Sequence, residues 1–110
     1  MQISDAVVGT WQLAMRTPIG TMSAELTFVS THHGLSGTAT GKDETVPLTD
    51  IRVEPAAAGH RVLWRQQITR PLRLNLEFDV LVDGDTLSGT SRAGRLPRSD
   101  VSGTRAAEPR

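Results

Sequence analysis

The sequence predicts an all-β protein: an eight-stranded antiparallel up-and-down barrel built from two similar four-strand halves. Threonine and valine, which favour strands, are frequent, and Gly or Pro punctuation recurs about every eight to twelve residues. No stretch sustains apolar residues at helical spacing, which argues against helices. The tetrapeptide Leu-Ser-Gly-Thr occurs twice, at 35–38 and at 87–90. This repetition indicates that one structural unit occurs twice in a single domain spanning residues 1–110.

The repeated tetrapeptide lies within a longer match between the two halves, about 9–54 and 60–105. The matched pairs are Trp11 and Trp64, Pro18 and Pro71, Glu25 and Glu77, Leu26 and Phe78, and Phe28 and Val80. VPLTDI at 46–51 also matches LPRSDV at 96–101, so the spacing drifts from 53 to 50 residues. We assign the drift to turns, where insertions are tolerated.

Each half is predicted to contain four strands, joined by turns rich in Gly, Pro and Asp. The expected strands lie near 9–16, 20–30, 34–40, 45–54, 60–69, 72–82, 86–92 and 97–105, followed by a flexible tail at 106–110. Eight strands without helices must protect their edges, and closing the sheet into a barrel achieves this. A two-sheet sandwich is the structural alternative. The doubled meander favours the barrel, because the last strand can then pair with the first.

Two short motifs carry a resemblance to a known family. Gly9-Thr10-Trp11 begins the first predicted strand, and the last strand ends in Ser-Gly-Thr-Arg at Arg105. The chain thereby resembles the calycins, the superfamily of lipocalins and avidins. The resemblance implies that Trp11 closes the barrel floor and that Arg105 stacks on its indole, a cation–π contact. The chain is also similar to a group of uncharacterised small bacterial domains with the pattern TPxG…LSGT…DGDTLSGT…SGTR.

Strand alternation predicts which side chains face the lumen, because neighbouring residues point to opposite faces of a sheet. If Trp11 faces inward, the lumen is apolar with a few uncharged polar groups. The expected ligand contacts are Met15, Met22, Leu26, Phe28, Trp64, Gln66, Ile68, Leu74, Leu76, Phe78 and Ser91, with Arg16 and Arg73 at the mouth. Thr49, Ile51, Val53, Ser99 and Val101 are also expected to face inward. Such a lining suits a small-molecule cavity, and a fully packed core is the alternative.

The charges are predicted to be polarised along the barrel although the formal net charge is zero. Connections in a meander alternate between the two ends, so four predicted turns share the open end. That end would carry Arg16, Lys42, Arg70, Arg73, Arg92, Arg95 and Arg98 against Asp43 and Glu44, whereas Glu54, Asp83 and Asp85 lie at the floor. A basic mouth would attract anions. The alternative is that these arginines serve only solubility.

No residue pattern indicates catalytic or metal chemistry. The chain has no cysteine, which excludes disulfides and thiolate sites. His32 and His33 are adjacent, so their side chains should diverge in a turn rather than share a metal. Glu25 and Glu77 are expected to face outward on opposite sides of the barrel, unlike a catalytic carboxylate pair. We therefore expect no metal and no cofactor.

The leading functional hypothesis is a cytoplasmic protein that binds a small hydrophobic, anionic molecule in the barrel. The first alternative is a cofactor-independent cyclase, isomerase or lyase acting on such a molecule, with Gln66, Arg16 and Arg70 as candidate catalytic residues. The second is a structural module in which outward-facing Val46, Leu48 and Leu63 seat a homodimer. Neither nucleic acid nor membrane is an expected partner.

Overall fold

The computed structural model describes residues 7–17, 20–41, 44–69 and 73–106, and within these ranges it contains strands and no helix. The strands are β1 (Gly9–Thr17), β2 (Gly20–Thr31), β3 (Gly34–Thr40), β4 (Thr45–Pro47), β5 (Thr49–Pro55), β6 (His60–Ile68), β7 (Leu74–Asp83), β8 (Thr86–Ala93) and β9 (Ser99–Arg105). They form one antiparallel sheet in the order β4-β3-β2-β1-β9-β8-β7-β6-β5. The predicted all-β, up-and-down architecture is confirmed.

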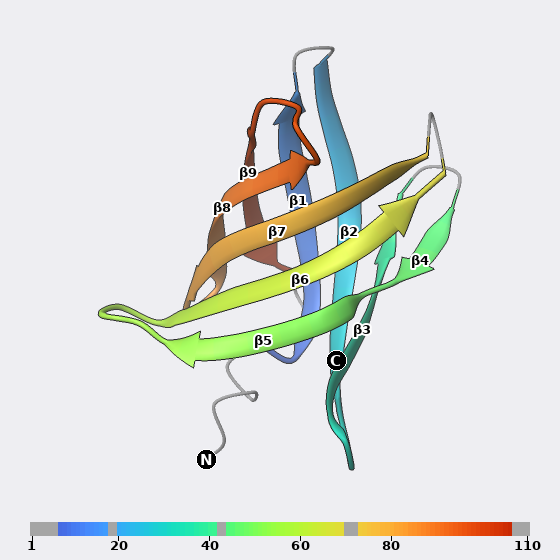
Figure 1. Ribbon diagram of the computed structural model, residues 1–110. Coiled ribbons are helices and arrows are strands. Elements are labelled where there is room, and N and C mark those ends of the chain that lie inside the picture. The colour runs from blue at the N-terminus through green and yellow to red at the C-terminus, as the bar shows by residue number, and fades with distance from the viewer. Residues whose placement is uncertain (1–6, 18–19, 42–43, 70–72, 107–110) are drawn as a thin grey trace.

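The sheet curls into a nearly closed barrel. The first and last strands pair, with Trp11 opposite Arg105 and Arg16 opposite Asp100. In Figure 1, β5, β6 and β7 cross in front of β1, β2 and β3, so these two parts of the sheet face each other across the interior. The chain therefore forms a single wrapped sheet rather than a two-sheet sandwich.

The structure has nine strands among its described residues, not eight, because the predicted strand at 45–54 is divided at Leu48. β4 pairs with β3, whereas β5 pairs with β6, so consecutive segments of chain occupy the two opposite edges of the sheet. The cause lies just after the break. Asp50 has a φ of 52°, and the β5–β6 register shifts between Thr49 and Arg52. A left-handed residue at a bulge redirects a strand, and aspartate tolerates that conformation better than most residues.

The two halves share their strand registers. Trp11 lies opposite Leu26 as Trp64 lies opposite Phe78, and Glu25 opposite Thr40 corresponds to Glu77 opposite Arg92. The predicted match between 46–51 and 96–101 is wrong, however. The N–H of Leu48 bonds to Gly37, and the equivalent Gly89 faces Val101, so Leu48 corresponds to Val101. The spacing is 53 residues for the tryptophans, 52 for the repeated tetrapeptide and 53 again for Leu48 and Val101.

The glycine of the repeated tetrapeptide is required by close strand approach. A Cβ at Gly37 would lie 2.7 Å from the carbonyl oxygen of Thr27, and a Cβ at Gly89 would overlap the carbonyl oxygen of the equivalent Asp79. Both glycines therefore occur where the preceding strand leaves no room for a side chain. The same packing requirement in each half accounts for the repeated tetrapeptide.

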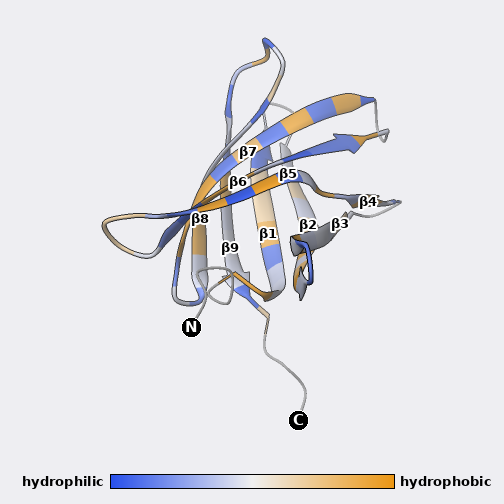
Figure 2. Ribbon diagram, turned by 60° about the horizontal axis from the view of Figure 1, so that its bottom comes forward, coloured by the Kyte–Doolittle hydropathy of each residue, from blue (hydrophilic) through white to orange (hydrophobic). Residues whose placement is uncertain are grey.

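The core follows the predicted alternation of inward and outward side chains, which Figure 2 shows as alternating colours along β7. Around the break at Leu48, three sequence predictions are wrong. Val46 and Leu48 are buried core residues rather than outward-facing ones, and Thr49 is exposed rather than inward-facing. The division and bulge reverse the alternation there. Leu63 faces outward as expected, but it is half-buried.

Candidate functional site

The barrel floor is closed by Trp11 and Arg105. The Trp11 side chain is fully buried, and its Nε1 donates a hydrogen bond to the Val7 carbonyl at 3.0 Å. The Arg105 guanidinium carbon lies 4.3 Å from the centroid of the indole ring. Arg105 also donates to the Asp85 carboxylate at 2.9 Å and to the carbonyl of Val8. These contacts join both ends of the described chain and leave no ligand space at the floor.

The lumen above the floor contains a cluster of three aromatic rings. The Trp64 and Phe78 rings are stacked, with centroids 4.7 Å apart and an interplanar angle of 7°. Phe28 meets Trp64 edge to face, with centroids 5.6 Å apart. All three side chains are at most 3% exposed. Because the rings come from β2, β6 and β7, the cluster spans the interior.

Gln66 is the buried polar group beside this cluster. Its Oε1 accepts a hydrogen bond from Trp64 Nε1 at 3.0 Å, and the side chain is 8% exposed. No partner for its Nε2 is recorded among the described residues. Because every fully enclosed side-chain nitrogen and oxygen among them has a partner, Nε2 must reach accessible space. This nitrogen can therefore donate a hydrogen bond to a ligand in the lumen.

Replacing Gln66 with methionine should lower the free energy of unfolding by about 1–3 kcal/mol, because the buried Trp64 N–H loses its acceptor. The control is Gln67→Met at the exposed neighbouring position, which should change stability by less than about 0.5 kcal/mol. Urea unfolding followed by circular dichroism measures both variants. Equal stability of the two variants would show that the Trp64–Gln66 hydrogen bond does not contribute to the free energy of unfolding.

The inward-facing side chains become more exposed from floor to mouth. Val62 and Val82 are at most 1% exposed, whereas Ile68 and Leu74, at the opposite ends of the same strands, are half-buried. Met22, which faces inward opposite Met15, is 36% exposed. The floor is thus packed, and the apolar mouth is accessible.

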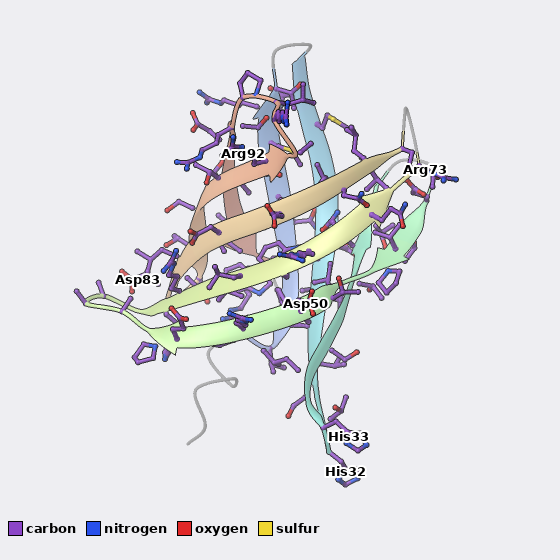
Figure 3. The ribbon with its side chains drawn as sticks, viewed as in Figure 1. His32, His33, Asp50, Arg73, Asp83 and Arg92 are labelled. Carbon is purple, nitrogen blue, oxygen red and sulfur yellow. The ribbon has the colours of Figure 1, made fainter. Side chains whose placement is uncertain are left out.

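The arginines predicted at the mouth lie on its rim or outer face. Arg16 is opposite Asp100 and Thr21 in an outward-facing row. Figure 3 shows Arg73 beside the ends of β6 and β7, and Arg92 on β8. Arg70, Lys42, Asp43 and Leu72, like residues 107–110 of the predicted tail, lie outside the described residues. Among the residues that are described, the ionisable side chains in inward-facing rows are His60 and Arg105, both toward the floor.

The outer face of β5, β6 and β7 carries a network of ion pairs. Arg61 binds Asp79 through two hydrogen bonds of 2.6 and 2.9 Å and lies 3.8 Å from Glu54. On the same face, Arg65 lies 3.1 Å from Glu77. The hydrogen bonds from Arg61 hold the pKa of Asp79 below its usual range, and the same pairing raises the pKa of Arg61. These charges engage one another rather than the lumen.

The lowered pKa of Asp79 predicts an acid-dependent contribution to stability. The contribution should be complete above the ordinary aspartate pKa of about 4 and lost as pH falls through the lowered value. Because both side chains are about half exposed, it should be a small part of the unfolding free energy. Asp79→Asn should therefore be less stable than wild type at pH 7 and equally stable in strong acid. Urea midpoints of the two proteins across pH measure this, and a stability difference that does not change with pH would contradict it.

A hollow of 610 Å³ lies at the junction of β4, β5, β6 and β7. Its lining consists of Pro47, Thr49, Asp50, Arg65, Gln66, Gln67, Asn75, Leu76, Glu77 and Gly94. Gln66 and Leu76 belong to the lumen, whereas Gln67 and Asn75 are exposed. Most of the lining residues are exposed, and the hollow adjoins two residues of the inward-facing rows, Gln66 and Leu76. Gln66 and Leu76 were predicted from the sequence as lumen residues, whereas Pro47 and Gln67 were not, although a proline inside a predicted strand signals irregular pairing.

The acidic and histidine residues considered for chemistry do not converge. Glu25 is exposed and accepts a hydrogen bond from Gln12, and Glu77 pairs with Arg65. His32 and His33 project from the exposed β2–β3 turn (Figure 3). No group of three His, Asp or Glu side chains that could hold a metal occurs within the described ranges. Those ranges also contain no helix suited to crossing a membrane.

Comparison with known proteins adds no assignment: no protein-family model matches the chain, and no curated protein sequence matches it significantly. The proposed function therefore depends on the geometry of the barrel.

Proposed function

We propose that the barrel binds one small hydrophobic molecule in its lumen, admitted at the mouth. The observation that carries this proposal is the buried Gln66, whose unpartnered Nε2 lies beside the stacked Trp64 and Phe78. An apolar cavity with one or two well-placed hydrogen-bonding groups is the usual form of a small-molecule site. A barrel of about eight strands has room for one such ligand. The accessible apolar side chains at the mouth support the same direction of access.

The ligand is further proposed to carry a negative group that stays at the rim. Arg73, Arg92, Arg95 and Arg98 are exposed toward that end, whereas the middle of the described lumen has no charged side chain. Rim cations raise the local concentration of an anionic ligand without requiring burial of its charge. The calycin-like arrangement, with Arg105 over Trp11 at a closed floor, supports this mode of binding by likeness of fold.

A lumen-filling substitution tests the proposal. Ala93 is a half-buried, inward-facing residue opposite Leu76, so Ala93→Trp should fill the space above Gln66. The probe is 1-anilinonaphthalene-8-sulfonate, a hydrophobic anion that fluoresces when desolvated. Wild type should bind it at one site, and Ala93→Trp should weaken binding at least about tenfold, which corresponds to about 1.4 kcal/mol.

The matched control is Ala14→Trp, which adds the same side chain on the outer face, opposite Ser23 and Ser102. This variant should bind the probe as wild type does. Urea unfolding of both variants shows that the barrel remains folded. Equal binding by Ala93→Trp and wild type, or no binding to wild type, would contradict a ligand site in the lumen.

A further inference from the structure

Among the described strands, the wall has unpaired edges where the two ends of the sheet meet, and one of these gaps, the seam, lies between Thr45–Pro47 of β4 and Gln66–Ile68 of β6. β7 pairs with β6 along its whole length, from His60 to Ile68. On the other side of β6, however, the pairing with β5 ends at Thr49 opposite Arg65. β4 then runs near β6, but the described residues form no backbone hydrogen bond across this gap.

Pro47 explains why the seam stays open. Continuing the register of Thr49 and Arg65 places Pro47 opposite Gln67. The N–H of Leu48 donates to the Gly37 carbonyl on β3. Because the backbone groups of successive residues in a strand point to opposite sides, those of Pro47 point toward β6. Proline has no N–H to donate there. A full pair of backbone hydrogen bonds with Gln67 is therefore impossible.

Gln67 consequently keeps a backbone donor and a backbone acceptor without a recorded partner among the described residues. The backbone groups of Arg65 and Thr69 face the same edge and are satisfied by side chains. Thr49 Oγ1 donates to the Arg65 carbonyl at 3.2 Å, and the Thr69 N–H donates to Glu44 at 2.7 Å. Glu44 also accepts from Thr69 Oγ1 at 2.7 Å, which holds the two edges together beyond the gap. The Arg65 carbonyl and the Thr69 N–H thus have partners, whereas neither backbone group of Gln67 has one recorded.

The seam adjoins the proposed ligand site, because residues of both line one hollow. The 610 Å³ hollow is lined by Pro47 and Gln67 together with Gln66 and Leu76 of the lumen. Gln66 is nine-tenths buried and has an unpartnered Nε2. Gln66 and Gln67 therefore border the same hollow, and Gln66 is bonded to Trp64 of the aromatic cluster. Unpaired groups of this kind are costly unless water or a ligand bonds to them.

We propose that this seam binds an amide of the lumen ligand whose N–H and C=O lie on one edge, as in a primary amide or a lactam. This inference rests on the proposed function and adds the chemical class of the ligand. The C=O of such an amide accepts a hydrogen bond from the Gln67 N–H, and its N–H donates to the Gln67 carbonyl, as a paired strand residue would. A carboxylate offers only acceptors, and an ester lacks a donor, so each leaves the Gln67 carbonyl unpaired. A negative group elsewhere on the ligand stays at the rim.

Three probes of equal chain length test this class: octanamide, octanoate and methyl octanoate. Octanamide should bind at least about tenfold more tightly than either of the others, the gain expected from completing one more hydrogen bond.

In wild type without ligand, the Gln67 backbone amide should exchange with deuterium much faster than the amide of Leu63, whose backbone faces β5. Octanamide should slow the Gln67 exchange at least about tenfold and shift its resonance.

Pro47→Ala is the variant that separates this seam from the rest of the lumen. It restores an N–H opposite Gln67, so β4 can pair with β6, the Gln67 amide becomes protected and the preference for octanamide disappears. Binding of 1-anilinonaphthalene-8-sulfonate should stay within about twofold of wild type. The control is Pro55→Ala, which removes an exposed proline opposite His60 and should keep the octanamide preference.

The outcomes distinguish the two proposals. If wild type binds none of the probes, the proposed function fails, and this inference fails with it. If the anilinonaphthalene probe binds but octanamide and octanoate bind equally, or Gln67 is unaffected by octanamide, the seam proposal alone is overturned. The wild-type exchange measurement decides the matter even if Pro47→Ala does not fold.

Discussion

Gly89→Ala is expected to destabilise the barrel by about 3 kcal/mol or more, at the upper end of overpacking costs. A Cβ at this position would overlap the carbonyl oxygen of Asp79 and lie 2.6 Å from the Cα of Val80. Both atoms belong to the backbone of β7, so no side-chain rotation can relieve the clash. The β7–β8 pair would have to separate locally. Urea unfolding followed by circular dichroism measures the loss.

Two other glycines calibrate this prediction. Gly41→Ala introduces a Cβ with no atom within 4 Å, so its stability should stay within about 0.5 kcal/mol of wild type. Gly37→Ala should fall between the two, because its nearest contact is 2.7 Å and two of its neighbours are side-chain atoms. A Gly89→Ala protein as stable as Gly41→Ala would contradict the close packing of β7 against β8.

Trp11→Ala is expected to lower the free energy of unfolding by about 3–5 kcal/mol, the cost of removing a fully buried aromatic side chain. The substitution removes a large part of the floor. It also leaves the Val7 carbonyl without its donor and the Arg105 guanidinium without the ring beneath it. Thermal and urea unfolding both measure the effect.

Arg105→Met separates the floor packing from the charge. Methionine keeps much of the aliphatic bulk over Trp11 but loses the cation–π contact and the hydrogen bonds to Asp85 and Val8. We expect a loss of about 1–3 kcal/mol, smaller than that of Trp11→Ala. A larger loss for Arg105→Met than for Trp11→Ala would show that the ring is not the main element of the floor.

Local pattern and repetition predicted most of the fold. The tryptophan spacing and the repeated tetrapeptide indicated two equivalent units, and the structure gives equivalent registers around Trp11 and Trp64. Alternation from an inward Trp11 placed Leu26, Phe28, Leu76 and Phe78 in the core, where they are buried. These features depend on period-two patterning and close packing, which a sequence displays directly.

The division of the predicted fourth strand could not be read from the same pattern. The apolar positions change phase between Leu48 and Ile51, which signals an irregularity within residues 45–54, but nothing local requires the chain to change partners at Leu48. That change depends on how far the sheet has curled when its two edges meet, a property of the whole barrel. Pro47 and Asp50 were the local signals, because proline weakens pairing and aspartate tolerates a positive φ.

The sequence predicted which residues line the candidate site better than it predicted which way the rim arginines face. Gln66 and the apolar lining followed from alternation, whereas the side on which the rim arginines lie depended on register. Arg16 is on β1 near the mouth, as expected, yet its row faces outward opposite Asp100. Gln67 was passed over because its role depends on its backbone rather than its side chain. No residue-type motif reveals a missing strand partner.

The most direct test of the lumen as a ligand site uses the two tryptophan indole N–H resonances of the chain. Trp64 lies in the proposed site beside Gln66, whereas Trp11 lies in the closed floor. Titration with 1-anilinonaphthalene-8-sulfonate should shift the Trp64 indole resonance saturably and leave the Trp11 resonance unchanged. If the probe binds while Trp64 does not move, or if both indoles respond equally, the lumen is not the binding site.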